Sequence, residues 1–559
     1  MLNEVKHLTL SKRDSSAAPQ NDTHHLTCAV PLAGYSMLPT SLALPPSLML
    51  RRTGRRTSDA RYSFYFFHSP DFRRIKFFIF VFFALAFGCF VAKSWSMELI
   101  DVSSDGRSFV ERDSKQLYIP FGTNYYDPHT GWAPKIWRQF DSEKVRRHFQ
   151  VMQQLGVNCA RVFLTAASFQ PTAETVEEEA LKKLDKLVEI ARESGIRLVL
   201  TGPDHWEGWP SYWKPDRFAG ENSLRALERF WDIVGRRYRG EPAIFSWDIL
   251  NEPHLPWFVE EWRPLWSAWL KETYKSWDKL KTAWGKELAD ANQWDEISAP
   301  ADKPDANGPK LRDWQLFREH LADRWVGRQV EALRKADPTH LISVGYIQWS
   351  YPLVRHGNPG RYAAFNPHRQ AGLLDFMTIH FYPTLGDPFD SEQNWVKNLG
   401  YLQAVLAYCH AGKPVLLGEY GWYGGGAAQN NPYRTEEQQA NWLCAEVEAT
   451  RPLAAGWLSW SFADTPGSTD MSLFGGLVKS DLTIKVWGER FKSLAANLTE
   501  LKRPTPKLPA FDFPDALTAD DEALSRMHQS YVEAIRQAIR QSGVMTEPVE
   551  KGKETPQAK

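Results

Sequence analysis

Two short segments of the sequence each place a glutamate where acid–base chemistry needs one. Glu252 lies in Asn-Glu-Pro, directly after the apolar stretch 244–250, and Glu419 ends a second apolar stretch, 414–419. Two carboxyl groups can cleave a glycosidic bond when one protonates the leaving oxygen and the other, about 5–5.5 Å away, attacks the anomeric carbon. One carboxyl must then stay protonated and the other ionised, so their surroundings must separate the two pKa values.

Further polar and aromatic side chains stand at or near the ends of apolar stretches: Asn251, Arg161, His380, Tyr382 and Trp460. Arg161 is suited to stabilising the ionised Glu419, and Tyr382 to donating a hydrogen bond to it. Asn251 can hold a sugar 2-hydroxyl, and Trp460 can form the floor under a sugar ring. Each also has a purely structural interpretation, such as a buried ion pair for Arg161 or plain core for Trp460. Because all of these residues stand at or near the ends of apolar stretches, a shared catalytic role is favoured over separate structural ones.

The elements that must position these residues alternate along the chain. Eight short apolar stretches are strand candidates: 117–126, 157–164, 196–201, 244–250, 340–345, 376–382, 414–419 and 456–461. Helical spacing of apolar residues lies between them, at 142–155, 174–194, 223–238, 311–336, 391–411, 435–450 and 486–498. Eight strand–helix units predict an α/β fold, a (β/α)₈ barrel. A doubly wound open sheet is the rival, but no Gly-rich phosphate loop follows the first strand.

A barrel brings the candidate residues together, because catalytic residues stand at the C-terminal ends of its strands. Glu252 ends the fourth predicted strand and Glu419 the seventh, so both carboxyls project over one mouth. The third strand ends near His205 and Trp206, which adds a histidine and an indole to the same face.

Three parts of the chain lie outside the regular alternation. Residues 257–310, between the fourth and fifth strands, form a long Trp-rich insertion that we expect to cover part of the mouth. A Pro-rich linker, 499–517, follows the barrel of residues 96–498. The chain then ends in an amphipathic helix, about 518–541, and a polar tail that extends to residue 559.

The first hundred residues differ in composition from the rest. Residues 1–75 are rich in Ser, Thr, Pro and Arg, which predicts a disordered extension or a start codon assigned too early. A basic cluster at 73–76 precedes the uncharged run 77–92. This pattern predicts a signal peptide or membrane anchor over residues 76–93. The barrel is therefore expected to act outside the cytoplasm, secreted or anchored to a membrane.

Composition excludes several other classes of protein. Lysine and arginine together equal aspartate and glutamate at 67 each, so the net charge is zero and no nucleic-acid partner is expected. The five cysteines form no CxxC pair, and HExxH, GxSxG and GxxxxGK[ST] motifs are absent. No cofactor and no metal are expected. The sequence carries no signal for the oligomeric state.

Several segments resemble clan A glycoside hydrolases, above all family 5 and its endo-β-mannanase-like members. The strongest are FSWDILNEP at 245–253 and PVLLGEYG at 414–421. Supporting likenesses are GTNYY at 122–126, NCARVF at 158–163, IHFYP at 379–383, WLSWSF at 457–462 and LVKSDLTIKVWGERF at 477–491. The resemblance covers roughly residues 96–498.

The resemblance implies a role for each matching residue. Glu252 would be the acid/base and Glu419 the nucleophile of a retaining enzyme. Asn251 would bind the 2-hydroxyl, Arg161 and Tyr382 would support the nucleophile, and His380 and Trp460 would line the subsite of the attacked sugar. His205 and Trp206 match the third-strand position loosely.

The substrate is less sharply indicated. The segment 274–300 resembles family 42 β-galactosidases, whereas DHWEGWPSYW at 204–213 resembles the mannanase-like group. We expect a polysaccharide or oligosaccharide of the β-mannan or β-glucan type. The alternatives are a β-galactosidase-like exo-enzyme, a non-catalytic sugar-binding barrel and a metal-dependent barrel hydrolase, for which only His205 and His380 stand at strand ends.

Overall fold

The computed structural model describes residues 97–130, 135–206, 208–289, 291–301, 308–352, 359–428, 431–501, 506–510 and 521–542. Residues 96–559 form one compact unit, distinct from residues 1–95. The predicted extension 1–75, the segment 76–93, much of the linker 499–517 and the tail after 542 lie outside the described residues, so these remain predictions. Among the helices that are described, none combines the length and the apolar character needed to cross a bilayer.

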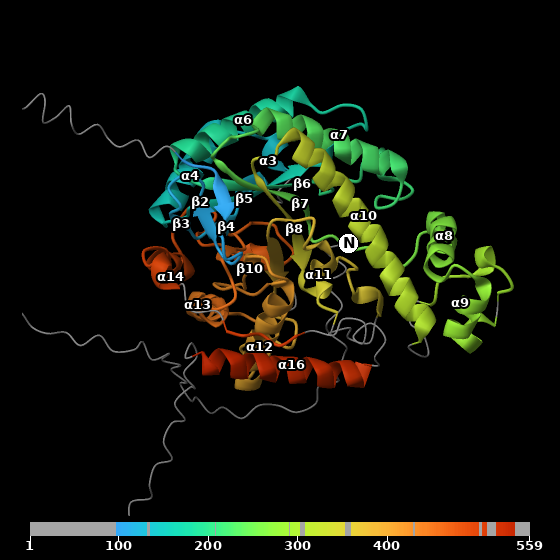
Figure 1. Cartoon of the computed structure of the whole chain (residues 1–559). Helices are drawn as coiled ribbons and strands as arrows, with labels where there is room; N and C mark the ends of the chain where they lie inside the picture. Colours follow the sequence, from blue (N-terminus) through green and yellow to red (C-terminus); the bar gives the residue numbers. More distant parts are fainter. Residues whose placement is uncertain are drawn as a thin grey trace, which may run out of the picture. The chain divides into compact units, whose positions relative to one another are not determined.

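Eight parallel strands close into a barrel surrounded by helices, which confirms the predicted (β/α)₈ fold (Figure 1). The order around the barrel is β10-β11-β4-β5-β6-β7-β8-β9, so consecutive strands are neighbours and β11 closes against β4. Nearly every strand residue is buried, because helices cover the outer face and side chains fill the interior. The strands are β4 (Phe121–Asn124), β5 (Cys159–Thr165), β6 (Arg197–Asp204), β7 (Ile244–Asn251), β8 (Leu341–Ile347), β9 (Met377–Phe381), β10 (Val415–Tyr420) and β11 (Gly456–Ser459).

The first predicted strand, 117–126, is in fact two strands with different partners. β3 (Leu117–Tyr118) pairs antiparallel with β2 (Phe109–Glu111), which pairs with β1 (Ile100–Val102), whereas β4 belongs to the barrel. Pro120 lies between β3 and β4 and has no N–H to continue a ladder. The turn between β1 and β2 contains Gly106, whose φ is +69°.

The small β1–β3 sheet closes the N-terminal end of the barrel. The ring of Phe109 lies edge-on to Phe245 and Phe376, at centroid distances of 5.0 and 5.2 Å. Phe109 is fully buried, and burial of one such ring contributes about 1.5–3 kcal/mol. The hairpin residues therefore belong to the barrel core rather than to a separate domain.

The predicted helices appear within a few residues of their expected bounds. The long helices are α4 (Ser142–Gln154), α6 (Glu178–Glu193), α7 (Glu221–Tyr238), α10 (Pro309–Ala336), α12 (Glu392–Cys409), α13 (Glu436–Thr450) and α14 (Val486–Ala495). Short helices are α3 (Lys135–Arg138), α5 (Ala166–Phe169) and α11 (Pro367–Gln370). The side chain of Asp141 caps α4, and Thr435 with Gln438 forms a capping box on α13, which satisfies backbone N–H groups in the first turns.

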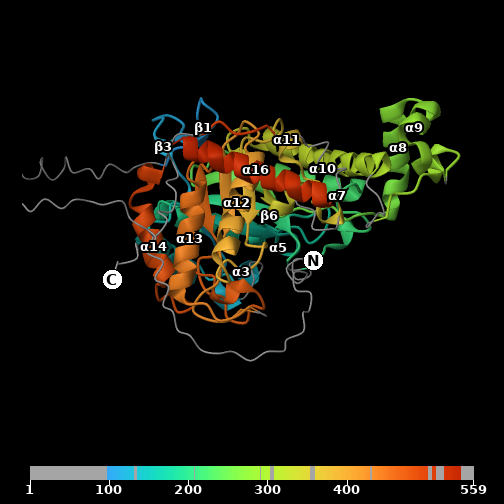
Figure 2. The ribbon, with the colours of Figure 1, turned by 90° about the horizontal axis from the view of Figure 1, so that it is seen from below.

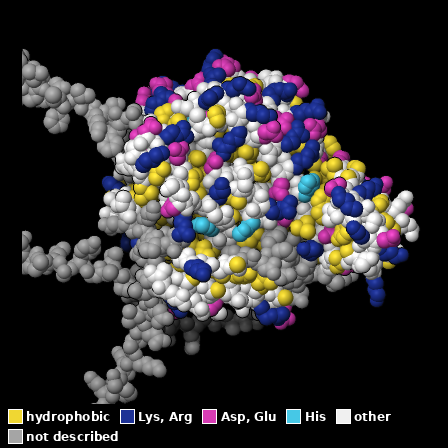
Figure 3. Space-filling view, in the orientation of Figure 1, with side chains coloured by type: hydrophobic (Ala, Val, Ile, Leu, Met, Phe, Trp, Pro, Cys, Tyr) yellow, Lys and Arg dark blue, Asp and Glu magenta, His cyan; other side chains and the backbone are white. Residues whose placement is uncertain are grey.

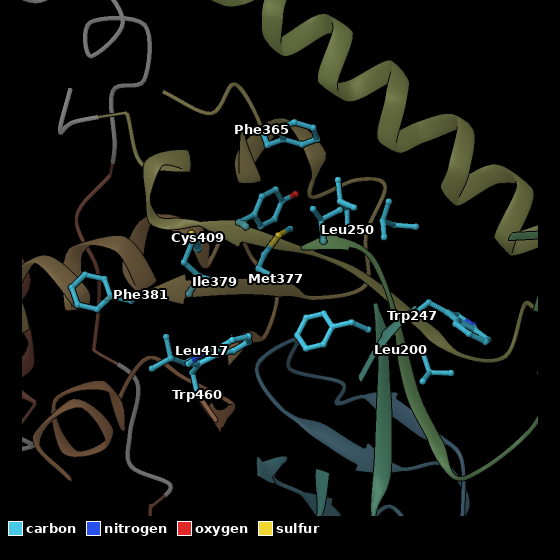
Figure 4. Packing of buried hydrophobic residues seen from close by; sticks show 14 of the residues in the cluster. Leu200, Trp247, Leu250, Phe365, Met377, Ile379, Phe381, Cys409, Leu417 and Trp460 are labelled. Carbon is cyan, nitrogen blue, oxygen red and sulfur yellow. The ribbon is translucent and has the colours of Figure 1, made fainter. Parts of the chain in front are cut away.

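Buried side chains from strands and helices interdigitate around the barrel (Figure 4). Trp247 and Leu250 of β7, Met377 and Ile379 of β9 and Leu417 of β10 are all at most 2% exposed and belong to one contiguous cluster. On the face seen in Figure 3, basic and acidic side chains are interspersed without a patch of one sign, in keeping with the balanced composition.

The insertion forms α8 (Arg263–Tyr274) and α9 (Trp277–Trp284), which pack on the first half of α10. α10 has 28 residues, about 42 Å at 1.5 Å per residue, so it extends past its neighbours and carries these helices. In Figures 1 and 2, α8 and α9 project to one side of the barrel, at one end of α10. The Trp-rich faces of α8 and α9 pack against α10, and the expectation that the insertion covers part of the mouth stays a prediction.

The C-terminal amphipathic helix α16 (Asp521–Gln541) packs along α12 (Figure 2). Its apolar side chains Leu524, Ile535 and Ile539 are buried. Arg536 Nη2 donates to the backbone oxygen of Val396 at 2.8 Å. The helix is thus part of the folded unit that contains the barrel.

Glu446 of α13 is a fully buried carboxyl that makes no hydrogen bond within the described residues. Burial raises its pKa well above the usual range, so the native state keeps this proton at pH values at which the unfolded chain has lost it. The unfolded chain releases this proton near the ordinary pKa of 4.5. Above that pH the free energy of unfolding therefore loses about 1.4 kcal/mol per pH unit through this one group.

We expect Glu446→Gln to remove that loss, because glutamine has nearly the same size and does not titrate. Urea unfolding at pH 5, 6 and 7 should show a shallower fall of the free energy of unfolding in the variant than in the parent. Glu448→Gln, on a half-exposed position of the same helix, is the matched control. Parallel pH profiles for parent and Glu446→Gln would contradict this prediction.

Candidate active site

Glu252 and Glu419 meet at the C-terminal end of the barrel, as predicted. Glu252 directly follows β7 with φ +44°, a left-handed backbone conformation that is uncommon for a residue with a side chain. Its backbone N–H donates to the Gly345 oxygen at 2.7 Å, which holds this turn against β8. Glu419 is the last residue but one of β10. Both glutamates are buried, at 9% and 3% exposure.

His380 of β9 lies between the two carboxyls. Its Nδ1 is 3.2 Å from Glu252 Oε1 and 3.3 Å from Glu419 Oε1. One oxygen of Glu252, one of Glu419 and this nitrogen all lie within 4.8 Å of one another. Carboxyl oxygens this close fit the roughly 5–5.5 Å between the carboxyl groups of retaining glycoside hydrolysis better than the 6.5–9.5 Å of the inverting reaction.

Arg161 of β5 is the hub of the site. It is fully buried, and every one of its N–H donors has an acceptor. Nε and Nη2 donate to Asp248 Oδ2, Nη2 also to Asn251 Oδ1, and Nη1 to Asn124 Oδ1 and to Glu419 Oε1 at 2.7 Å. Burial lowers the pKa of Arg161, but the two carboxylates outweigh that effect and raise it, so the guanidinium stays charged.

Asp248, which the sequence analysis did not single out, is the main counter-charge of Arg161. Its Oδ2 also accepts from Thr201 Oγ1 at 2.7 Å, and its Oδ1 accepts from the Gly345 N–H at 2.7 Å. A signal for it existed: Asp248 interrupts the otherwise apolar run 244–250, and a fully buried carboxylate is rare unless it is paired.

Tyr382 binds the second oxygen of Glu419, as predicted. Its hydroxyl donates to Oε2 at 2.6 Å. Burial, and then the charge of Glu419, raise the pKa of Tyr382 well above its usual range, so the hydroxyl stays a donor. Gln348, in the short helix η6 (Gln348–Ser350), holds the backbone of Tyr382. Its Oε1 accepts from the backbone N–H of Tyr382 at 2.8 Å, and its Nε2 donates to the backbone oxygen of Tyr382 at 3.1 Å.

Two glycines, Gly345 and Gly418, leave room for this network, and the sequence indicated no such role for either. A Cβ at Gly345 would lie 3.0 Å from Arg161 Nη2, 3.1 Å from Asp248 Oδ2 and 3.1 Å from His380 Cε1. A Cβ at Gly418 would lie 2.3 Å from the side chain of Thr378. In the sequence, both glycines lie within ordinary strand candidates. The contacts inside the folded barrel explain why neither position has room for a side chain.

Aromatic side chains form one wall of the site. Trp460 is buried, its Nε1 donates to Ser472 Oγ at 3.0 Å, and its ring lies 6.0 Å from Phe163. Phe163 in turn lies 4.7 Å from Trp206 and 4.6 Å beneath the Arg161 guanidinium. Trp460 and Trp206 are thus joined through Phe163.

His205 lies beyond this wall, and its contacts among the described residues are with Asp204, Trp209 and Arg217 rather than with the two glutamates. Its Nδ1 lies 3.0 Å from Asp204 Oδ1 and its ring lies 4.6 Å from that of Trp209. The structure therefore joins Glu252, Glu419, Arg161, Asn251, His380 and Tyr382 in one network, and places His205 in a neighbouring cluster.

The loop that carries Glu252 is held by Arg318 of α10. This fully buried guanidinium donates to the backbone oxygens of Leu255, at 2.8 Å, of Pro256, at 3.3 Å, and of Tyr362, at 3.0 Å. Burial lowers its pKa to about 10, which leaves it charged at neutral pH. The ring of Trp257 lies 5.2 Å from its guanidinium carbon.

The Glu252–His380–Glu419 group has the spacing of a three-ligand metal site. However, both oxygens of Glu419 already accept hydrogen bonds, and the Arg161 guanidinium lies 2.7 Å from one of them. A divalent cation there would be repelled at close range by a fixed positive charge. The donor set fits a carboxylate pair better than a metal centre, and the expectation of a metal-free reaction remains a prediction.

Comparison with known proteins links this geometry to two related groups. The family described as Beta-galactosidase, glycoside hydrolase family 42, matches residues 220–449, which include both glutamates. The Beta-galactosidase bgaB of Geobacillus kaustophilus is 25% identical over 43% of this chain and 41% of its own length. The Mannan endo-1,4-beta-mannosidase A of Emericella nidulans is 23% identical over 58% of this chain and 65% of its own length.

The fold also matches solved structures. GH5_18 from Streptomyces cattleya, crystallised in complex with GlcNAc, superposes with a TM-score of 0.55 at 16% identity, over 78% of this chain and 92% of that chain. The chain spans less than two thirds of the length of the two curated relatives named above.

The barrel, the positions of the two glutamates and these similarities relate the chain to β-galactosidases and mannan endo-1,4-beta-mannosidases.

We expect Asp248→Asn to destabilise the fold, because it leaves the buried Arg161 charge with one carboxylate instead of two. Breaking a fully buried ion pair costs about 3–5 kcal/mol. Chemical denaturation of parent and variant measures this loss directly. The matched control is Lys182→Met, which removes an exposed ion pair with Glu179 and should cost less than about 1 kcal/mol. Equal losses in the two variants would contradict the hub role of Arg161.

Proposed function

We propose that the protein is a retaining glycoside hydrolase that cleaves β-glycosidic bonds by double displacement. This proposal rests on the different surroundings of the two carboxyl groups. Arg161 and Tyr382 both donate to Glu419, which favours its ionised, nucleophilic form. Glu252 lies across His380 within retaining distance and is suited to the protonated, acid role.

The reaction proceeds in two steps. The carboxyl of Glu252 gives its proton to the glycosidic oxygen as a Glu419 oxygen attacks C1 from the opposite face, which releases the leaving alcohol and forms a glycosyl ester. The Glu252 carboxylate then takes a proton from water, and the resulting oxygen attacks C1 and displaces Glu419. Asn251, whose Oδ1 is held by Arg161, directs its Nδ2 away from that guanidinium, where it can bind the sugar 2-hydroxyl.

We propose β-mannan or β-glucan type polysaccharides or oligosaccharides as substrates. The resemblance of segment 204–213 to the mannanase-like group and the similarity to Mannan endo-1,4-beta-mannosidase A support this choice. The second candidate is a β-galactoside, which the family 42 match over residues 220–449 favours.

The first test is hydrolysis of glucomannan by the full chain, followed by proton NMR of the first product. We expect reducing-sugar release with the β-anomer formed first. Glu419→Gln should lower the rate at least about a thousandfold, because it removes the nucleophile. Glu437→Gln, an exposed acid on α13, should keep the parent rate. An α-anomer formed first would exclude double displacement, and release only from aryl β-galactosides would favour the second candidate.

The position of Glu252 generates a separate prediction for Arg318. Arg318→Met frees three backbone oxygens that hold the Glu252 loop, so proton donation to the leaving group should suffer most. We expect kcat/KM to fall at least about tenfold with alkyl glycosides, and much less with dinitrophenyl glycosides, whose leaving group needs no proton. Arg324→Met, on a more exposed turn of the same helix, is the control. An equal loss with both substrates would assign Arg318 a purely structural role.

A further inference from the structure

The segment between β6 and the short helix η2 (Ser211–Trp213) carries an indole that the catalytic network does not use. We propose that Trp209 is a stacking subsite for a second sugar unit of a β-linked oligosaccharide. This inference rests on the proposed glycosidase function and deepens it. We call Trp209 with His205, Trp213 and Arg217 the indole platform.

Trp209 is unusually exposed. Trp209 is 45% exposed, whereas the other tryptophans among the described residues are buried or partly buried. It follows the C-terminal end of β6, the end of the barrel at which Glu252 and Glu419 stand. An indole in water at the mouth of a sugar-cleaving barrel offers a flat apolar face to the C–H groups of a pyranose ring.

The indole is held in place from its inner side. The Arg217 guanidinium carbon lies 5.1 Å from the Trp209 centroid and 4.1 Å from that of Trp213. Trp213 meets Trp209 edge-on at 5.6 Å, and the ring of His205 lies at 4.6 Å. A ring fixed in this way loses little conformational freedom when a ligand stacks on it.

Arg217 is a buried cation that supports the two indoles, although burial of its charge costs free energy. It is 7% exposed, and its Nε and Nη2 make no hydrogen bond within the described residues. Burial lowers its pKa to about 10, so the side chain remains charged at neutral pH. Its close contacts are the aromatic faces of Trp209 and Trp213, which attract a cation. The side chain is therefore a support for the two indoles.

The platform follows the same strand end as the aromatic wall of the site. Trp206 lies three residues before Trp209 and contacts Phe163, which contacts Trp460. In this proposal a sugar on Trp209 belongs to the same oligosaccharide as the sugar held between Glu252 and Glu419. The platform takes a pyranose with an apolar face, and its distance from the reacting bond means that it affects long substrates more than short ones.

The test compares mannohexaose and cellohexaose with the p-nitrophenyl monoglycosides of mannose and glucose, using the full chain. We expect Trp209→Ala to lower the ratio of kcat/KM for hexasaccharide over aryl glycoside at least about tenfold, the equivalent of 1.4 kcal/mol. Trp209→Phe should keep most of the ratio, because a ring remains. Trp277→Ala removes a tryptophan of α9 that pairs edge-on with Trp294, and should not change the ratio.

A ratio within twofold of the parent in Trp209→Ala would overturn the subsite. A binding measurement separates this failure from failure of the proposed function. Hexasaccharide affinity is measured by calorimetry in the Glu419→Gln background, with and without Trp209→Ala. A tenfold weaker affinity with Trp209→Ala supports the subsite even if the parent hydrolyses none of these sugars, and an unchanged affinity overturns it.

Discussion

A guanidinium that is completely shielded from water needs an acceptor for each N–H group, and Arg161 finds its acceptors on three other strands. Asn124 is on β4, Asp248 and Asn251 are on β7, and Glu419 is on β10. Because an unpaired buried charge costs several kcal/mol, the strands can close only in the arrangement that satisfies Arg161. The position of Glu419 and the orientation of the Asn251 amide follow from that requirement.

The surrounding structure serves the same network through backbone contacts. Gln348 fixes the main chain of Tyr382, and Arg318 fixes the carbonyls after Glu252. Gly345 gives the space in which Arg161, Asp248 and His380 approach each other. The left-handed backbone conformation at Glu252 has low intrinsic stability. It persists because neighbours on β8 and α10 hold the adjacent backbone in place.

The chain combines features of two groups within one clan. Its match to the family 42 description covers only residues 220–449, while its resemblance to the mannanase-like group lies partly before that range. In the proposed function, the chemistry rests on the barrel and its two glutamates, and the choice of sugar rests on the loops. Loops on a rigid barrel, such as the one that carries Trp209, can vary without disturbing the strands.

The sequence by itself determined the barrel and the two glutamates, since strands buried on both faces read as unbroken apolar runs and the motifs stand at their ends. It misjudged what depends on distant contacts. The stretch 117–126 reads as one strand, yet its halves pair with different partners.

The tertiary structure added the partners that the sequence did not indicate. The Arg161–Glu419 pair, 258 positions apart in the chain, was expected from two strand ends, whereas the pairing of Arg161 with Asp248, 87 positions away, was not. No local pattern distinguishes Asp248 as the partner of Arg161. Such pairings arise when closure of the barrel desolvates the guanidinium and forces each donor to find its acceptor.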